Sequence, residues 1–293
     1  MDINAEQENK MNIILRRRKL GKTSTREFSK FTNAIPVRND LLNKKIKEPI
    51  DWLICWGCTS QCQANHTVNK AEAISLAGNK KESRKILQEL NLPKRIVPRT
   101  WFSYEDWEDS DYEGAVIVRP THHAQGRSLY YLKTPADIIT FFTHTPKKLI
   151  PDNYYISEYI KKEKEFRVFV MQGKVVWIAE KTPENPEAIA WNVAQGGHFY
   201  NVRWNDWPLR ACRIAIQACE ALGLDFGGVD IMQKDKEFLI LEVNSAPSQT
   251  SPYRQQCTGK AFDYLIKSNN SKLETPEKVN SYKQFIHPGI KND

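Results

Sequence analysis

Asp230, Glu242 and Asn244 have the side-chain types and the spacing expected of a metal site. They lie in two apolar runs separated by a polar turn, which predicts a β-hairpin. Side chains alternate between the two faces of a strand, so these three polar groups share one face. With the turn centred on Asp235, Asp230 is expected opposite Ile240, and Glu242 is its diagonal neighbour. Carboxylate and amide oxygens suit Mg²⁺, which usually takes one or two carboxylates and leaves other positions to water and phosphate oxygens.

The other face of this hairpin is expected to be buried. It carries apolar side chains, namely Val229, Ile231, Leu239, Leu241 and Val243. The alternative for the polar face is a solvated strand surface that binds no metal ion.

Capped helices and short strands precede the hairpin and would position it. A helix is expected to begin after the capping residue Asn79 and to end before Pro93. A second capped helix follows Thr134 and has Pro135 at its first position. Further helices are expected near 24–31 and over 208–222, and strands are expected over 52–56, 116–120, 129–132, 154–159, 165–170 and 174–179.

The order of these elements divides the chain into four regions. Residues 1–78 are expected to form an N-terminal α/β substrate or recognition domain, and 79–157 a central, lid-like subdomain. Residues 158–268 are expected to form a C-terminal domain that carries the metal site, and 269–293 a polar tail.

The composition indicates a globular protein. The 293 residues, 40% of them hydrophobic, are enough for two or three compact subdomains. No stretch approaches the roughly 18 apolar residues that span a bilayer, and the start lacks the basic-then-apolar order of a signal peptide. We therefore expect a cytoplasmic protein without a membrane partner.

The excess of positive charge indicates affinity for anions. The net charge is +8 and the pI is near 9.0, although a nucleotide-binding cleft also concentrates Lys and Arg. Basic residues cluster at 16–19 and 44–47, which makes the N-terminal region the candidate recognition surface. Charge alone does not decide between a nucleic-acid partner and a small anionic one.

Cys55, Cys58 and Cys62, with His66 beyond them, have a spacing that permits zinc ligation. Cys55, however, lies in an apolar run that resembles a buried strand, and the chain has only one C-x-x-C motif there. Free thiols are therefore the expected state.

Six short motifs precede the hairpin, and each alone has a plain explanation as a surface charge, a turn or an ion pair. They contain Lys80, Arg119, Gln125 with Gly126, Ser157 to Ile160, Glu165 with Arg167, and Asn192 before a Gly-Gly pair. Their joint order resembles the ATP-grasp superfamily over roughly residues 75–250. The resemblance is closest to the ribosomal-protein glutamate ligase-like (RimK-like) branch of carboxylate–amine ligases.

The resemblance implies an α/β (α+β) chain with the ATP-grasp fold. That fold has an N-terminal α/β domain, a small lid subdomain and a C-terminal antiparallel-sheet domain, with ATP between the last two. Lys80 and Arg119 would be nucleotide-binding cations; the family usually has Lys at the second position, but Arg keeps the charge. The other implied nucleotide-binding residues are Gln125 and Gly126 in the phosphate loop, Glu158, Tyr159 and Ile160 at the adenine, and Glu165 at the ribose.

The resemblance also implies the catalytic groups. Arg167 would stabilise the reacting phosphate, and Asn192 would lie near the acyl acceptor. Lys181 would be a second basic group, although one residue of loop length decides whether Glu180 or Lys181 shares that face. The metal set would bind two Mg²⁺ ions, with Mn²⁺ as a possible substitute.

The implied reaction is ligation of a carboxylate substrate to an amine donor through an acyl phosphate, with release of ADP and phosphate. Kinase-type transfer to a hydroxyl, ATP-dependent modification of nucleic acid and non-catalytic nucleotide or nucleic-acid binding remain alternatives. A P-loop is excluded, because Gly21-Lys22-Thr23 has no partner glycine five residues earlier. Neither the substrates nor the oligomeric state follow from the sequence, and members of this branch occur in both bacteria and tailed phages. Substrate specificity is expected to lie in the N-terminal unit and in residues after Asn244, including Ser245, Tyr253 and Arg254.

Overall fold

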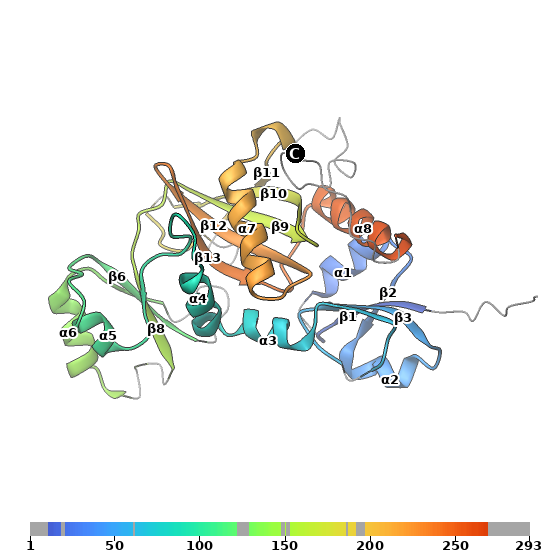
Figure 1. Cartoon of the computed structure of the whole chain (residues 1–293), viewed down its shortest axis with the longest axis horizontal. Coiled ribbons are helices and arrows are strands. Elements are labelled where there is room, and N and C mark those ends of the chain that lie inside the picture. The colour runs from blue at the N-terminus through green and yellow to red at the C-terminus, as the bar shows by residue number, and fades with distance from the viewer. Residues whose placement is uncertain are drawn as a thin grey trace, which may run out of the picture.

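Three sheets lie side by side along the molecule (Figure 1). A sheet of four strands lies at each end, and a sheet of five strands lies between them. The computed structural model describes residues 11–18, 21–60, 62–121, 129–147, 150, 153–185, 187–191 and 197–268. Across these residues, no helix is both long and apolar enough to cross a bilayer.

The N-terminal sheet is parallel, in the order β2-β1-β3-β4. Its inner strands are almost continuously apolar because both faces are covered, as expected for a parallel sheet. The strands are β1 (Met11–Arg16), β2 (Ile35–Arg38), β3 (Ile50–Trp56) and β4 (His66–Val68). The helices are α1 (Lys22–Ser29), η1 (Asn39–Leu41), α2 (Leu42–Lys45) and α3 (Ala71–Gly78).

The central subdomain has the predicted capped helices. Asn79 accepts the N–H of Glu82 at 3.1 Å, and Thr134 forms a complete capping box with Asp137. The sheet order is β5-β8-β6-β7, with antiparallel neighbours. Its elements are α4 (Lys80–Glu89), β5 (Thr100–Trp101), α5 (Tyr104–Glu108), β6 (Val116–Pro120), β7 (Tyr130–Leu132), α6 (Pro135–His144) and β8 (Tyr154–Glu158).

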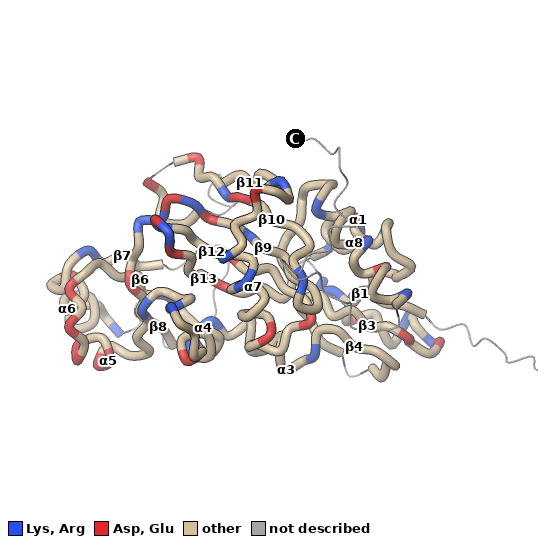
Figure 2. Tube along the Cα trace, turned by 45° about the horizontal axis from the view of Figure 1, so that its top comes forward, with Lys and Arg blue, Asp and Glu red and all other residues tan. Residues whose placement is uncertain are grey.

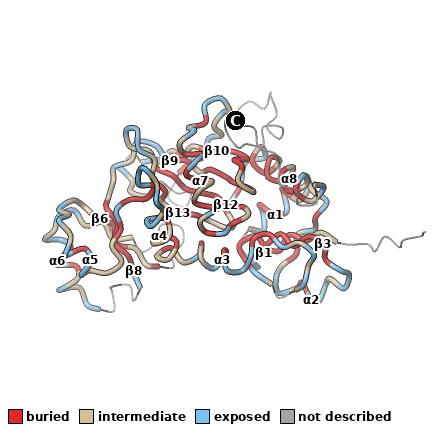
Figure 3. Tube along the Cα trace, in the orientation of Figure 1, coloured by how far each residue is buried: buried red, intermediate tan, exposed pale blue. Residues whose placement is uncertain are grey.

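The middle sheet is antiparallel, in the order β11-β10-β9-β12-β13. Helix α7 covers one face, where Val168, Ile178, Val229 and Ala215 share a core, and Figure 3 shows these strands largely buried. The elements are β9 (Lys164–Met171), β10 (Lys174–Thr182), β11 (His198–Asn201), η4 (Trp204–Asp206), α7 (Leu209–Ala221), β12 (Phe226–Lys234), β13 (Glu237–Asn244) and α8 (Pro252–Lys267).

The predicted hairpin of β12 and β13 is confirmed, but its predicted register is wrong. The turn has two residues, and a β-bulge lies beyond Ile240, so Asp230 pairs with Glu242 while Ile231 pairs with Ile240. The bulge also shifts the faces of β13. Ile240 packs in the core beside α7, whereas Leu241, which was expected there, lines a cavity on the opposite face.

The N-terminal unit and the middle sheet share a second core. Trp56 of β3 stacks on Phe226 of β12 with ring centres 5.4 Å apart, and Phe28 of α1 lies 5.6 Å from Phe262 of α8. The helices approach closely because Gly259 has no side chain; a Cβ there would lie 2.3 Å from the Phe28 carbonyl oxygen. The expected boundary near residue 78 therefore lies between two parts that are packed together. The expected tail, 269–293, lies outside the described residues.

Candidate active site

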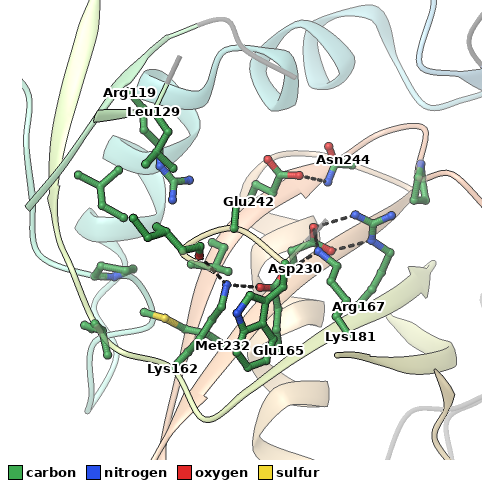
Figure 4. A pocket seen from close by; sticks show the side chains of 18 of the residues that line it. Arg119, Leu129, Lys162, Glu165, Arg167, Lys181, Asp230, Met232, Glu242 and Asn244 are labelled. Atoms are coloured by element: carbon green, nitrogen blue, oxygen red, sulfur yellow. Dashed lines mark hydrogen bonds and ion pairs between the residues drawn. The ribbon is translucent and has the colours of Figure 1, made fainter. Parts of the chain in front are cut away.

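A cavity of about 550 Å³ lies between the central subdomain and the face of the middle sheet opposite α7. Figure 4 shows Arg119 and Leu129 on one side and the polar groups of the sheet on the other. The described lining residues include six cations and four carboxylates, so the lining has an excess of positive charge. Figure 2 marks the positions of Lys and Arg in blue and those of Asp and Glu in red along the chain. The cations are Arg84, Arg119, Lys162, Arg167, Lys181 and Arg254, and the carboxylates are Glu158, Glu165, Asp230 and Glu242.

Asp230 is at the centre of the polar face and holds two cations. Arg167 Nε and Nη2 donate to its two oxygens at 2.7 and 2.8 Å, and Lys181 Nζ donates at 2.8 Å. Burial would raise the pKa of Asp230, but the charges of Arg167 and Lys181 hold that pKa below its usual value. Burial would lower the pKa of Arg167, and Asp230 more than offsets this effect. All three groups therefore stay ionised at neutral pH.

Lys181 lies on the cavity face, which resolves the open choice between it and Glu180. A bulge between Val175 and Trp177 sets the register of β10, so that Lys181 pairs with Glu165 across the ladder. Glu165 is buried between the ammonium groups of Lys181 and Lys162, the latter at 2.6 Å. The predicted ribose-side residue thus already forms ion pairs with two cations.

Glu242 and Asn244 follow each other along the same face of β13. Asn244 Nδ2 donates to Glu242 Oε1 at 2.8 Å, and Lys80 Nζ lies 3.6 Å from Glu242 Oε2. Burial would raise the pKa of Glu242, but Lys80 first and then the Asn244 hydrogen bond lower it. The three expected metal ligands are therefore brought together, with Asp230 and Glu242 paired across the ladder.

Lys80 is placed differently from the expected nucleotide contact. Its side chain is buried, donates to the Val243 carbonyl oxygen at 3.1 Å, and is not among the residues that line the cavity. It binds β13, the strand that carries Glu242 and Asn244. Its expected contact with a nucleotide stays a prediction.

The segment expected to hold adenine lines the other end of the cavity. Glu158, Tyr159 and Ile160 all belong to the lining. Glu158 accepts the N–H of Arg99 at 2.8 Å and also contacts the Arg95 guanidinium. Arg119 lines the cavity from β6, and its buried Nε has no hydrogen-bond partner among the described residues. Gln125, Gly126 and Asn192 lie outside the described residues.

Arg84 is a buried lining residue that sequence reasoning missed. Its Nη1 and Nη2 donate to the carbonyl oxygens of Ile240 and Leu241 at 2.8 and 2.7 Å. These are the residues of the β13 bulge, where the ladder pairing is interrupted. Arg84 therefore satisfies buried carbonyl groups and fixes the bulge that places Glu242 opposite Asp230. No signal in the sequence indicates this role of Arg84, because the bulge that Arg84 contacts becomes visible only with the register of β12 and β13.

Lys162 and Phe199 are further lining residues that were not predicted as site residues, and Arg254, expected among the specificity residues after Asn244, also lines the cavity. The Phe199 ring centre lies 5.1 Å from the Arg167 guanidinium, 5.4 Å from Lys181 Nζ and 5.4 Å from the Arg254 guanidinium. Such contacts hold cations over an aromatic face at close quarters. The strand 198–201 that carries this ring was not predicted.

The cysteine cluster lies in the N-terminal unit. Burial raises the pKa of the Cys55 thiol to about 12 and that of the Cys58 thiol to about 11. The Cys62 thiol lies 2.7 Å from Asn43 Oδ1, and the His66 ring stacks on Trp52 with centres 4.5 Å apart. Within the described part of the chain no group of three or more His, Cys, Asp or Glu is placed to hold a metal ion.

The fold and this cavity define the class of the protein. A family model described as "RimK-like ATP-grasp domain" matches residues 76–263, so the chain belongs to the RimK-like ATP-grasp family. Solved structures with the same fold include D-alanine–D-alanine ligase from Bacillus anthracis complexed with ATP. It has a TM-score of 0.61 and 16% identity, covering 88% of this chain and 96% of that one. The ATP-grasp ligase PsnB complexed with minimal precursor, Mg and ADP has a TM-score of 0.61 and 11% identity, covering 89% and 97%.

Similar curated proteins are named probable alpha-L-glutamate ligases. The protein from Parasynechococcus marenigrum is 34% identical over 134 residues, which cover 45% of this chain and 28% of the relative. The protein from Shewanella halifaxensis is 30% identical over 190 residues, covering 61% and 39%. That from Legionella pneumophila strain Corby is 27% identical over 212 residues, covering 69% and 67%. The chain thus matches well under half the length of the first two.

Proposed function

We propose that this chain is an ATP-dependent carboxylate–amine ligase that forms an amide or peptide-like bond through an acyl phosphate. Membership of the RimK-like ATP-grasp family supports this, as do relatives named glutamate ligases and structural neighbours that hold ATP, or ADP with Mg. The observation that carries the proposal is the paired cluster of Arg167, Asp230 and Lys181 at the centre of a positively charged cavity.

The cavity suits ATP with its phosphates toward this cluster. Glu158, Tyr159 and Ile160 would receive the base, with Arg119 and Lys162 near the phosphates. Phosphoryl transfer depends mainly on positioning and on neutralising charge, which fixed cations in a buried site provide. Arg119 Nε has no partner among the described residues, so it is ready to donate to a phosphate oxygen.

The reaction has two steps. A carboxylate oxygen of the substrate attacks the γ-phosphorus of ATP, the bond to the β-phosphate oxygen breaks, and ADP leaves. The amine nitrogen then attacks the acyl carbon, phosphate leaves with the bond electrons, and the amine loses a proton as the amide forms. Arg167 would stabilise the negative charge that develops on the transferred phosphoryl group.

Asp230, Glu242 and Asn244 fit Mg²⁺ by their donor chemistry. A carboxylate offers about four acceptor sites, and Asp230 uses three of them for Arg167 and Lys181, which leaves about one free. Among the described residues, Glu242 Oε2 forms an ion pair with Lys80, at 3.6 Å. We propose that these three residues hold two Mg²⁺ ions, with Mn²⁺ as a substitute, and that the ions neutralise phosphate charge when bound. Asn192 is proposed to lie near the acyl acceptor.

The test is release of ADP and phosphate from Mg·ATP across a panel of amino acids, acidic peptides and DNA. Asp230→Asn and Glu242→Gln serve as inactive controls, and Lys234→Gln, an exposed change on the same hairpin, serves as a matched active control. Release that requires both a carboxylate and an amine, and is lost in the inactive controls, is expected. ADP release with a phosphorylated hydroxyl product would establish a kinase instead, and binding of DNA or nucleotide without turnover would favour a binding protein.

A further inference from the structure

Arg254 is a buried cation in the cavity with no acidic partner among the described residues. Arg254 is 4% exposed, and its Nη1 donates to Asn201 Oδ1 at 2.8 Å. The guanidinium lies 5.7 Å from the Trp177 ring centre and 5.4 Å from that of Phe199. Neutral contacts of this kind orient a charge but do not balance it. A buried ion without a counter-charge is costly, so this position calls for an anion from outside the described chain.

Arg167, the neighbouring arginine in the cavity, differs from Arg254 in having a carboxylate partner. Both guanidinium groups lie against Phe199, but Arg167 has two hydrogen bonds to Asp230, whereas Arg254 has none to a carboxylate of the residues that the structure describes. Burial, and then repulsion by Arg167, lowers the pKa of Arg254 to about 10, so it stays charged at neutral pH. Of the two neighbouring arginines, one is already neutralised and the other remains available to a ligand.

The sheet register shows where along the cavity this free charge lies. Glu165 pairs with Lys181, and the next position on that face pairs Arg167 with Asp230. Beyond it comes Trp177, over which Arg254 lies. Arg254 is therefore on the far side of the central pair from Glu165, which is the side expected to hold the ribose. A substrate that reacts at the central pair would reach Arg254 from the side opposite the nucleotide.

The start of α8 holds Arg254 in place and adds to its field. Arg254 is in the first turn of this helix of 16 residues, and no acidic residue lies in that turn. Asn201 accepts from Arg254 through Oδ1 and donates through Nδ2 to Ser251 Oγ at 3.3 Å. One amide thus anchors both the helix cap and the guanidinium. The positive end of the helix dipole reinforces the attraction for an anion.

We propose that Arg254 and the first turn of α8 form a subsite for a free carboxylate of the substrate, and that Arg254 selects an amine donor that carries one. This inference rests on the proposed ligase function and goes beyond it by naming a selecting residue. A guanidinium fork matches a planar carboxylate, and here the guanidinium lies over two aromatic rings, those of Trp177 and Phe199. Ser248 and Thr250 also line the cavity and offer hydroxyl groups to a ligand.

Binding measured by calorimetry tests the subsite without turnover. The full chain is saturated with ADP and Mg²⁺ and titrated with free amino acids, with their α-carboxamides and with inorganic phosphate. Wild-type protein is expected to bind an amino acid and to reject its carboxamide. Arg254→Gln should weaken that binding by about tenfold or more and remove the discrimination, which is the loss expected for a charge-assisted contact. Arg254→Lys should recover part of it.

Two matched variants separate the subsite from general damage. Arg213→Gln removes an exposed arginine from α7 and should leave binding unchanged. Asn201→Asp gives Arg254 an internal carboxylate and should weaken amino-acid binding while ADP affinity is kept. The proposal is overturned if Arg254→Gln binds like wild type, if no amino acid binds, or if inorganic phosphate binds better than every carboxylate. Carboxylate binding through Arg254 without any ligase turnover would instead sink the proposed function and leave the subsite standing.

Discussion

Replacing Asp230 with Asn should destabilise the fold strongly, even though the two side chains have the same shape. Asp230 is 3% exposed and accepts three charged hydrogen bonds. In the variant, Lys181 keeps Glu165 as a partner. Arg167, however, loses Asp230, the one carboxylate among the described residues to which it donates a hydrogen bond. Leaving a buried charge unpaired in this way costs about 3–5 kcal/mol. At about 2–4 °C per kcal/mol, Tm should fall by about 6–20 °C.

The relative loss of stability in several variants tests this reasoning more sharply than the Tm change of one variant. Arg167→Met removes a cation and leaves Asp230 bound to Lys181, so it should cost less, about 1.5–3 kcal/mol. The double variant should cost less than the sum of the single ones, because no arginine is then left unpaired. Glu163→Gln, which breaks an exposed pair with Lys234, is the control and should leave Tm unchanged. Scanning calorimetry in the absence of ligands provides the values. A Tm for Asp230→Asn within about 2 °C of wild type, or a larger loss in Arg167→Met, would refute the reasoning.

Further predictions concern catalysis, pH and packing. Arg167→Gln should lower kcat more than it weakens ATP binding, and equal losses in the two quantities would contradict its proposed role. Burial raises the pKa of Asp225, so its native state favours the protonated form and stability falls as pH rises through that pKa. Asp225→Asn should therefore be more stable than wild type in urea at pH 7 and lose this advantage below about pH 4; an equal gain at both pH values would point to another cause. At Gly57, φ is +66° and an added Cβ would lie 2.5 Å from Ala246 Cβ. Gly57→Ala should lower Tm, and Ala246→Gly should restore part of the loss by removing the clash but not the backbone strain; a double variant no better than Gly57→Ala would exclude the clash.

The parts of the fold that local chemistry determines could be predicted from the sequence. The cap at Asn79, the capping box at Thr134 and the hairpin of β12 and β13 are each set by a few neighbouring residues, and each is present. The family resemblance rested on the order of several motifs, and the family model and the fold confirm it. The assigned roles of the individual site residues stay predictions.

The parts that depend on register could not be predicted. Nothing in the run that contains Leu241 marks a bulge, since it has neither Gly nor Pro, yet the bulge decides that Asp230 and Glu242 are direct partners. Arg84 stabilises that bulge from a helix 156 positions away in the sequence, so its burial follows only from tertiary packing. Arg254 is expected among the specificity residues after Asn244, but its burial over Trp177 and Phe199 follows only from tertiary packing.

The shared core between the first unit and the middle sheet also has a consequence for biosynthesis. Trp56 and Phe28 leave the ribosome long before Phe226 and Phe262, the rings that cover them. At about 5–20 residues per second, these aromatic faces remain uncovered for roughly ten to fifty seconds before their partners are synthesised. During that interval the nascent N-terminal sheet has one face without its cover. A translation pause before α8 would therefore leave an apolar surface open to aggregation or proteolysis at that stage of synthesis.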